Sequence, residues 1–177
     1  MVECIFCKIA TRAIQTNIIY EDNDVMAFLD VRPANPGHAL VIPKMHIMFL
    51  PQLPADLNAK ILQLIKIIAQ SQIEVLGAEG VNVLQNNGAA AGQAVPHVHF
   101  HVIPRFKNDK VTIAWEPCEL KEEQIKEILK RLKEHAQAIA TSIVAAEEQK
   151  LQAAPEEPKA PESKKKQKPI KLKPRHA

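Results

Sequence analysis

Three histidines at alternate positions, His97, His99 and His101, are the residues of this chain whose types and spacing best suit chemistry. Successive side chains of an extended strand point to opposite faces, so the three imidazoles share one face and the apolar residues between them face a core. Imidazole is largely neutral and nucleophilic at pH 7, which predicts that one histidine acts as a nucleophile while its neighbours bind an anion. A structural histidine cluster and an incidental metal patch are the alternatives, because neutral imidazole is also the commonest metal ligand.

Two cysteines near the start of the chain, Cys4 and Cys7, form a second group that can bind a metal ion. They supply only half of the four ligands that a zinc site needs. The alternative is that two small apolar side chains simply pack in a core. A thioredoxin-like redox role fits less well, because no strand-helix-strand unit surrounds the motif. With Cys118 the chain has three cysteines, too few for a disulfide scaffold.

Short apolar segments bounded by turn-forming residues predict the strands that position these side chains. Asp30 ends one such segment, where it is either a solvated turn residue or part of a site. His38 begins the next, and alternation places it on the same face as Leu40 and Ile42. The expected strands cover residues 18–20, 25–29, 38–42, 81–86 and 97–103.

Apolar residues at intervals of three and four predict a helix from Asp56 to Leu76, followed by Gly77 as a stop. Its stripe is expected to lie in the core and consists of Leu57, Ile61, Leu64, Ile65, Ile68 and Ile73. A second helix is expected from Glu119 to Gln149, with an apolar seam that can pack on the sheet or on a partner chain. These elements predict an α+β fold with an antiparallel sheet of about five strands and two main helices.

Composition predicts three parts, covering residues 1–118, 119–152 and 153–177. The first is the main domain, the second is the long helix, and the third is a Pro- and Lys-rich tail that is expected to be disordered. The net charge of +3 is unevenly distributed, because the basic character belongs to this tail and the rest of the chain is near neutral or acidic. The tail holds Lys164, Lys165, Lys166, Lys168, Lys171, Lys173 and Arg175. Such a tail can make weak contacts with nucleic acid or an anionic surface, or can act only as a solubilising segment.

The chain has no apolar run that approaches the roughly 18 residues needed to span a bilayer. Its first residues, Met1-Val2-Glu3-Cys4, do not resemble a secretory signal with a charged and then an apolar region. We therefore expect a cytoplasmic protein without a membrane span.

Two sequence segments together resemble the histidine triad (HIT) family of nucleotide hydrolases and transferases. One segment is Gly92 to Ile103, which contains the three alternate histidines, and the other is Gly37 to His46. The likeness extends from about Cys4 to Trp115 and keeps the motifs in the order typical of the family. The resemblance implies a homodimer with one active site per subunit.

The resemblance also implies a role for each candidate site residue. His99, the middle histidine, would be the nucleophile, with the main-chain carbonyl of His97 holding its opposite N–H. Asp30 would accept hydrogen bonds from the ribose hydroxyls, which suits a carboxylate with two acceptor oxygens. The donors to the phosphoryl or leaving-group oxygens would be His101, His38, Asn86 and Gln93. These donors would neutralise the phosphoryl charge, so no essential Mg²⁺ is expected.

A zinc site is implied in the same way. Many HIT proteins complete such a cysteine pair with two histidines, which fall here at His46 and His97. Cys4, Cys7, His46 and His97 would then form a closed tetrahedral set, which is typical of a structural Zn²⁺ ion.

The activity implied is cleavage at the α-phosphate of an adenosine or other purine nucleotide through a covalent nucleotidyl-histidine. Asn86 resembles the adenosine phosphoramidase branch, whereas Ile103-Pro104-Arg105 also occurs in the dinucleoside polyphosphate hydrolase branch. Ala94 stands where most characterised members have Ser or Thr, which leaves the leaving group open. The alternative function is a nucleotide-binding or scaffold module in which turnover is incidental.

Overall fold

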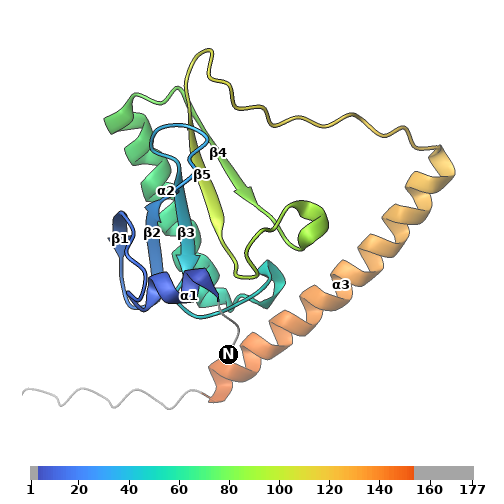
Figure 1. Cartoon of the computed structure of the whole chain (residues 1–177). Coiled ribbons are helices and arrows are strands. Elements are labelled where there is room, and N and C mark those ends of the chain that lie inside the picture. Colours follow the sequence, from blue (N-terminus) through green and yellow to red (C-terminus); the bar gives the residue numbers. More distant parts are fainter. Residues whose placement is uncertain (1–3, 154–177) are drawn as a thin grey trace, which may run out of the picture. The chain divides into compact units, whose positions relative to one another are not determined.

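Five strands form one antiparallel sheet in the order β1-β2-β3-β5-β4, as seen in a computed structural model that describes residues 4–153 (Figure 1). The crossover places β5 between β3 and β4, so the histidine-bearing strand lies inside the sheet. The strands are β1 (Ile18–Glu21), β2 (Val25–Leu29), β3 (Ala39–Pro43), β4 (Gly80–Gln85) and β5 (Phe100–Arg105). The α+β fold with an antiparallel sheet of five strands, predicted from the sequence, is confirmed.

The last strand is shifted along the chain relative to the prediction, because it runs from Phe100 to Arg105 and not from His97 to Ile103. The backbone at His97 turns tightly, with its N–H donating to the carbonyl of Val95 at 2.8 Å. The N–H of Val98 then donates to the carbonyl of Ile47 at 2.7 Å. His97 and His99 therefore precede the strand, and only His101 belongs to the β5 ladder.

Helix α2 (Ala55–Leu76) covers one face of the sheet (Figure 1). Its buried stripe packs against Val25, Ala27 and Val41, and against the apolar residues that alternate with the three histidines. One prediction for this stripe is wrong, since Ile73 is 50% exposed and the neighbouring Gln72 is only 3% exposed. The 3.6-residue period continues from Ile65 and Ile68 to position 72, so the helix buries that position although its residue is polar.

A short helix, α1 (Ile5–Ala10), covers the opposite face near the histidines (Figure 1). Phe6 and Ile9 of this helix join a second core cluster with Met26, Leu40 and Ile42, among others. The sequence analysis did not predict α1, because six residues are too few for a helical period to be evident. Two single turns of 3₁₀ helix, η1 (Leu50–Gln52) and η2 (Ala89–Ala91), lie in the connections.

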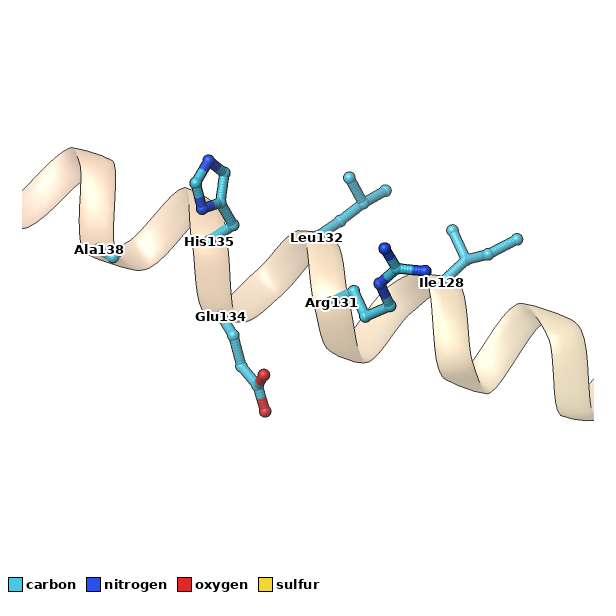
Figure 2. Close-up of a pocket in the computed structure, with 6 residues that line it drawn as sticks. All are labelled: Ile128, Arg131, Leu132, Glu134, His135 and Ala138. Carbon is cyan, nitrogen blue, oxygen red and sulfur yellow. The ribbon is translucent and has the colours of Figure 1, made fainter.

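The chain divides between Ala114 and Trp115 into two units, and we describe each by itself. The second unit contains an irregular segment and then α3 (Glu122–Ala153), which begins three residues later than the predicted Glu119. Figure 2 shows six α3 side chains around a shallow hollow, with Ile128, Leu132 and His135 extending to one side of the helix. A hollow lined by a single helix encloses nothing, so we assign it no site. The predicted basic tail lies outside the described residues, apart from Ala153.

Among residues 4–153, no helix combines the length and the apolar character needed to cross a membrane. The cytoplasmic location stays a prediction.

Candidate active site and metal cluster

A cavity of about 560 Å³ opens between α1, the first part of the sheet and the loop before the histidines. Its wall is largely apolar on the side of α1 and β2, where it includes Phe6, Ile9 and Phe28. Polar side chains gather elsewhere on the wall, and they are Asp30, Arg32, His99 and His101 among others. An apolar cavity with a few convergent polar groups is the usual form of a small-molecule site.

His99 is held in one orientation at the wall of this cavity. Its Nδ1 atom lies 2.7 Å from the main-chain carbonyl oxygen of His97, which can only accept a hydrogen bond. The ring also packs against Phe6, with ring centroids 5.1 Å apart. The proton therefore resides on Nδ1, and Nε2 carries a free lone pair.

His38 and His101 form a hydrogen-bonded pair whose proton positions follow from one backbone group. The N–H of Ala34 donates to Nδ1 of His38 at 3.1 Å, so the proton of a neutral His38 must be on Nε2. Nε2 of His38 lies 3.0 Å from Nδ1 of His101 and donates to it. The remaining proton of His101 is therefore on its Nε2, where it can donate to a ligand.

Burial keeps both members of this pair neutral at pH 7. It lowers the pKa of His38 despite the opposing effect of Asp30. Burial, followed by the nearby His99 and His38, lowers the pKa of His101 to about 4. Since both rings are neutral, Nε2–H of His38 donates to Nδ1 of His101, and the proton of His101 stays on Nε2.

Asp30 lies beside this pair with one carboxylate oxygen uncommitted. Its Oδ1 accepts the N–H of Arg32 at 2.8 Å. Its Oδ2 lies 3.7 Å from Nδ1 of His38 and 4.0 Å from Nδ1 of His101, but both nitrogens already accept hydrogen bonds. These three side chains have the spacing of a metal site. Because both ring nitrogens of His38 and Nδ1 of His101 already form hydrogen bonds within the protein, we interpret the three side chains as a hydrogen-bond network that leaves an acceptor on Asp30 and a donor on His101 for a ligand.

The loop before the histidines carries three other residues named in the sequence analysis. Gln93 uses both ends of its amide, since Oε1 accepts from the N–H of Gly88 at 2.7 Å and Nε2 donates to the carbonyl of Met48 at 2.9 Å. Neither Gln93 nor Asn86 is part of the cavity wall, whereas Ala94 is. Asn86 and Gln93 are thus not among the residues that line the cavity.

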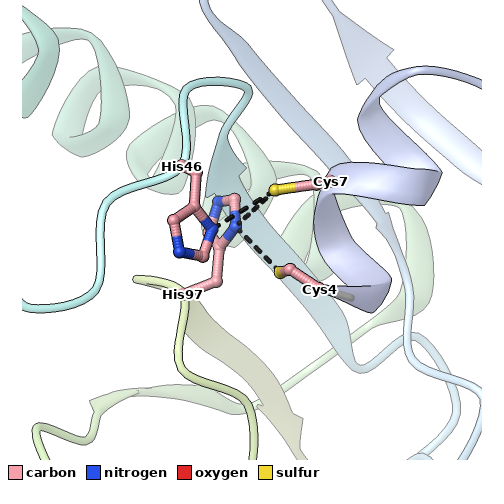
Figure 3. Close-up of side chains that lie close together, drawn as sticks. All are labelled: Cys4, Cys7, His46 and His97. Atoms are coloured by element: carbon pink, nitrogen blue, oxygen red, sulfur yellow. Dashed lines mark hydrogen bonds between the residues drawn. The ribbon is translucent and has the colours of Figure 1, made fainter. Parts of the chain in front are cut away.

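The second cluster contains the four predicted metal ligands, and Figure 3 shows their side chains pointing toward one another. Cys4 and Cys7 come from the start of α1, His46 from the segment after β3, and His97 from the segment before β5. Their potential ligand atoms all lie within 4.8 Å of one another. A sulfur-to-nitrogen distance of 3.4 Å joins Cys4 to His97, and one of 3.3 Å joins Cys7 to His46.

These distances and the chemistry of the donors fit a zinc ion. Tetrahedral Zn²⁺ with usual bond lengths separates its sulfur and nitrogen ligands by about 3.5 Å. Nε2 of His97 donates to the carbonyl of Pro43 at 2.9 Å, so its Nδ1 faces the thiols as an unprotonated ligand. Burial, followed by the adjacent Cys4, raises the pKa of the Cys7 thiol to about 11. A bound cation would reverse this effect, because coordination deprotonates thiols.

The sequence analysis assigned no structural role to two polar residues, Gln72 and Arg105. Gln72 of α2 donates to main-chain carbonyls next to His38 and His101. Arg105 at the end of β5 forms two hydrogen bonds of 2.7 Å with Asp109, in a network that also holds Asn35. The sequence signal that could have identified Gln72 is a glutamine at a position where the helical period of the stripe calls for an apolar residue.

Comparison with known proteins identifies the family. The HIT domain model matches residues 11–108, more than half of the chain, so this protein belongs to the HIT family. An uncharacterised HIT-like protein of Methanocaldococcus jannaschii is 41% identical over 73% of this chain and 98% of its own length. The adenosine 5'-monophosphoramidase of Schizosaccharomyces pombe is 41% identical over 70% of this chain and 90% of its own length.

Solved structures of similar proteins share the fold. A HIT family member from Bacillus subtilis has 36% identity and a TM-score of 0.70, and the match covers 75% of this chain and 96% of that one. A zinc-bound histidine triad protein from Mycobacterium smegmatis has 36% identity and a TM-score of 0.60, and the match covers 77% of this chain and 97% of that one.

Proposed function

We propose that this protein is a hydrolase or transferase that cleaves at the α-phosphate of an adenosine or other purine nucleotide, through a covalent bond to His99. The observation that carries the proposal is the 2.7 Å contact between Nδ1 of His99 and the carbonyl oxygen of His97. It leaves the Nε2 lone pair of His99 available at the wall of a cavity large enough for a nucleotide.

In the first step, Nε2 of His99 forms a bond to the α-phosphorus while the bond from phosphorus to the leaving group breaks. For a phosphoramidate, the leaving nitrogen takes a proton from water and departs as an amine. The positive charge that develops on the His99 ring is stabilised through its Nδ1–H and the carbonyl of His97. Water then attacks phosphorus, the bond to His99 breaks, and the nucleoside monophosphate is released with the water proton passing to solvent.

The other polar groups of the cavity would bind the substrate. Nε2–H of His101 donates to a phosphoryl oxygen, and His38 maintains that proton arrangement through its bond to His101. Asp30 accepts from the ribose hydroxyls with its uncommitted oxygen. Asn86 and Gln93 stay in the proposed set on the basis of the resemblance, and Gln93 would first have to release Gly88 and Met48.

An amine is the leaving group that we favour. A relative of 41% identity is named an adenosine 5'-monophosphoramidase. The second option, a nucleotide leaving group, depended on the Ile103-Pro104-Arg105 segment. All hydrogen-bonding nitrogens of Arg105 are engaged, since they donate to Asp109, Asn82 and Val111. Four of the five N–H donors of Arg105 are thus used within the protein, which leaves at most one for a second nucleotide.

We propose that Cys4, Cys7, His46 and His97 hold a structural zinc ion, supported by their geometry and by the zinc-bound relative. The ion would fix α1 to the segment that precedes the nucleophile, and it would take no part in the reaction. We also propose a homodimer, as the family resemblance implies, and a reaction that needs no Mg²⁺.

A side-by-side product assay tests the function. Adenosine phosphoramidate, an aminoacyl-adenylate analogue and diadenosine polyphosphates would be offered at equal concentration, each with and without Mg²⁺. We expect AMP release to be fastest from the phosphoramidate and unchanged by Mg²⁺. A control for the histidine variants is His135→Ala, which removes an exposed histidine of α3 and should release AMP at the native rate.

The alternative is a nucleotide-binding or scaffold module in which turnover is incidental. Its partner-binding segment would be the basic tail, which lies outside the described residues. Tight nucleotide binding without turnover of any substrate in the panel would favour it.

A further inference from the structure

Gln72 is a buried polar residue for which the proposed reaction has no direct use. It lies on the sheet-facing side of α2 and is 3% exposed. Its Nε2 donates to the carbonyl of Gly37 and to the carbonyl of Val102, at 2.9 Å in each case. Its Oε1 is buried and has no hydrogen-bond partner among the described residues. Burying this oxygen without a hydrogen bond lowers the stability of the fold. The two hydrogen bonds that the Gln72 amide donates therefore need an explanation.

The two carbonyls lie beside the two members of the histidine pair. Gly37 immediately precedes His38, and Val102 immediately follows His101. The ladder between β3 and β5 ends at the pairing of Ala39 with Val102. Gln72 therefore joins the two chain segments at the point where backbone pairing stops.

A second contact from α2 supports the same function. A β-carbon added at Gly37 would clash with Cδ1 of Leu76, and Gly37 has a φ of +90°, which favours glycine. Leu76 thus limits the position of Gly37 by packing, and Gln72 limits it by hydrogen bonding. Both contacts act on the residue next to His38.

We propose that Gln72 is a positioning residue that holds His38 and His101 at hydrogen-bonding distance, and so keeps the proton of His101 on the nitrogen that faces the substrate. Without it, the segments that carry the two rings would still be joined by the rest of the sheet and by the hydrogen bond from Asn35 to the carbonyl of Pro104, but neither link lies directly beside both rings. The 3.0 Å bond between the rings would then lengthen, and His101 would populate both neutral tautomers. This inference rests on the proposed function for its effect on turnover. The effect of Gln72 on the distance between the two rings and on the tautomer of His101 does not depend on any substrate.

The test is Gln72→Met, which keeps the length of the side chain and removes both donors together with the unpaired oxygen. Nitrogen-15 NMR of the histidine rings reports the tautomers without substrate. We expect His101 to be protonated on Nε2 in the native protein and to be a mixture of tautomers in the variant. In the assay with adenosine phosphoramidate, a misplaced donor should lower kcat by about 10- to 100-fold, with KM changed less than about twofold.

Two controls separate positioning from general loss of packing. Gln70→Met alters an exposed glutamine of α2, and Ile65→Val removes one methyl group from the buried stripe of the same helix. Both should keep the native tautomer and kcat. Gln72→Asn retains the amide on a shorter side chain that cannot bond both carbonyls together, so it should give an intermediate result, and it replaces the methionine variant if that one does not fold.

Native-like tautomers and kcat in Gln72→Met would overturn the proposal and leave Gln72 as a packing residue. A native protein that turns over none of the substrates would contradict the proposed function alone, because the NMR comparison still decides the role of Gln72.

Discussion

The Nδ1 atom of His97 lies 3.4 Å from the Sγ atom of Cys4, although 93 positions separate the two residues in the chain. The same histidine gives its main-chain carbonyl to His99 at 2.7 Å. One residue thus links the proposed metal ligands to the proposed nucleophile. Disturbing the cluster should therefore affect both the stability of the fold and the orientation of His99.

We predict about one zinc ion per chain in protein purified without a tag, as one four-ligand site requires. Cys4→Ser should lose the metal and lower the melting temperature by on the order of 10 °C or more, because metal binding contributes directly to folding. Elemental analysis and thermal unfolding provide the measurements. Cys118→Ser, at an exposed cysteine of the second unit, is the matched control. Full stability in metal-free native protein would show that the cysteines serve only for packing.

His99→Ala should lower turnover by at least about 10³-fold, since it removes the atom that bonds to phosphorus. Nucleotide binding should persist through Asp30 and His101. In native protein, rapid quench with substrate labelled at the α-phosphate should trap an acid-labile, base-stable adduct, as expected for a phosphorus–nitrogen bond. Near-normal turnover by the variant would falsify the covalent mechanism. His101→Ala should retain a residual rate, because the nucleophile is still present.

Stability should decrease as the pH falls from about 6.5 to about 4. The ordinary histidine pKa is 6.5, and burial lowers that of His101 to about 4, so the unfolded chain binds more protons than the folded one in this window. The free energy of unfolding should fall by on the order of 2 kcal/mol, after allowance for partial exposure of the ring. His101→Asn should flatten this part of the profile in denaturant titrations. An unchanged slope in the variant would assign the effect to other groups.

Asp109→Asn should lower the melting temperature by several degrees, because it breaks the two-point interaction with Arg105 and weakens the bond to Asn35. Arg105 holds the pKa of Asp109 well below its ordinary value of 3.8, despite the opposite effect of burial. This contribution is complete above pH 3.8 and is lost only below it, so it is separable from the histidine effect. Asp24→Asn, which removes an exposed ion pair with Lys60, should have a much smaller effect on thermal unfolding.

Truncation before Pro155 should leave turnover intact, because the tail holds no predicted site residue. Binding to a polyanion such as heparin should weaken in the same truncated protein. Activity assays and salt-dependent binding measurements check the two parts. A collapse of turnover would show that the tail takes part in the site.

The local pattern of the sequence was sufficient for the fold class. Alternation between Val98, Phe100 and Val102 predicted their burial, and the period of α2 predicted its bounds within one residue. These features depend on neighbours in the chain, which residue types and spacing describe directly. The four residues of the metal cluster were also found from the sequence, through family motifs and not through spacing.

Tertiary structure decided which groups each histidine contacts. Phe6 of α1 packs against the rings of His97 and His99, but of the three histidines only His97 is approached by the thiols of Cys4 and Cys7. The segment before β3 brings His38 to His101. It also decided that Gln72, and not Ile73, faces the sheet. The physical reason is that a hydrogen bond or a ligand set needs the approach of a second segment, and that approach is fixed by packing far along the chain.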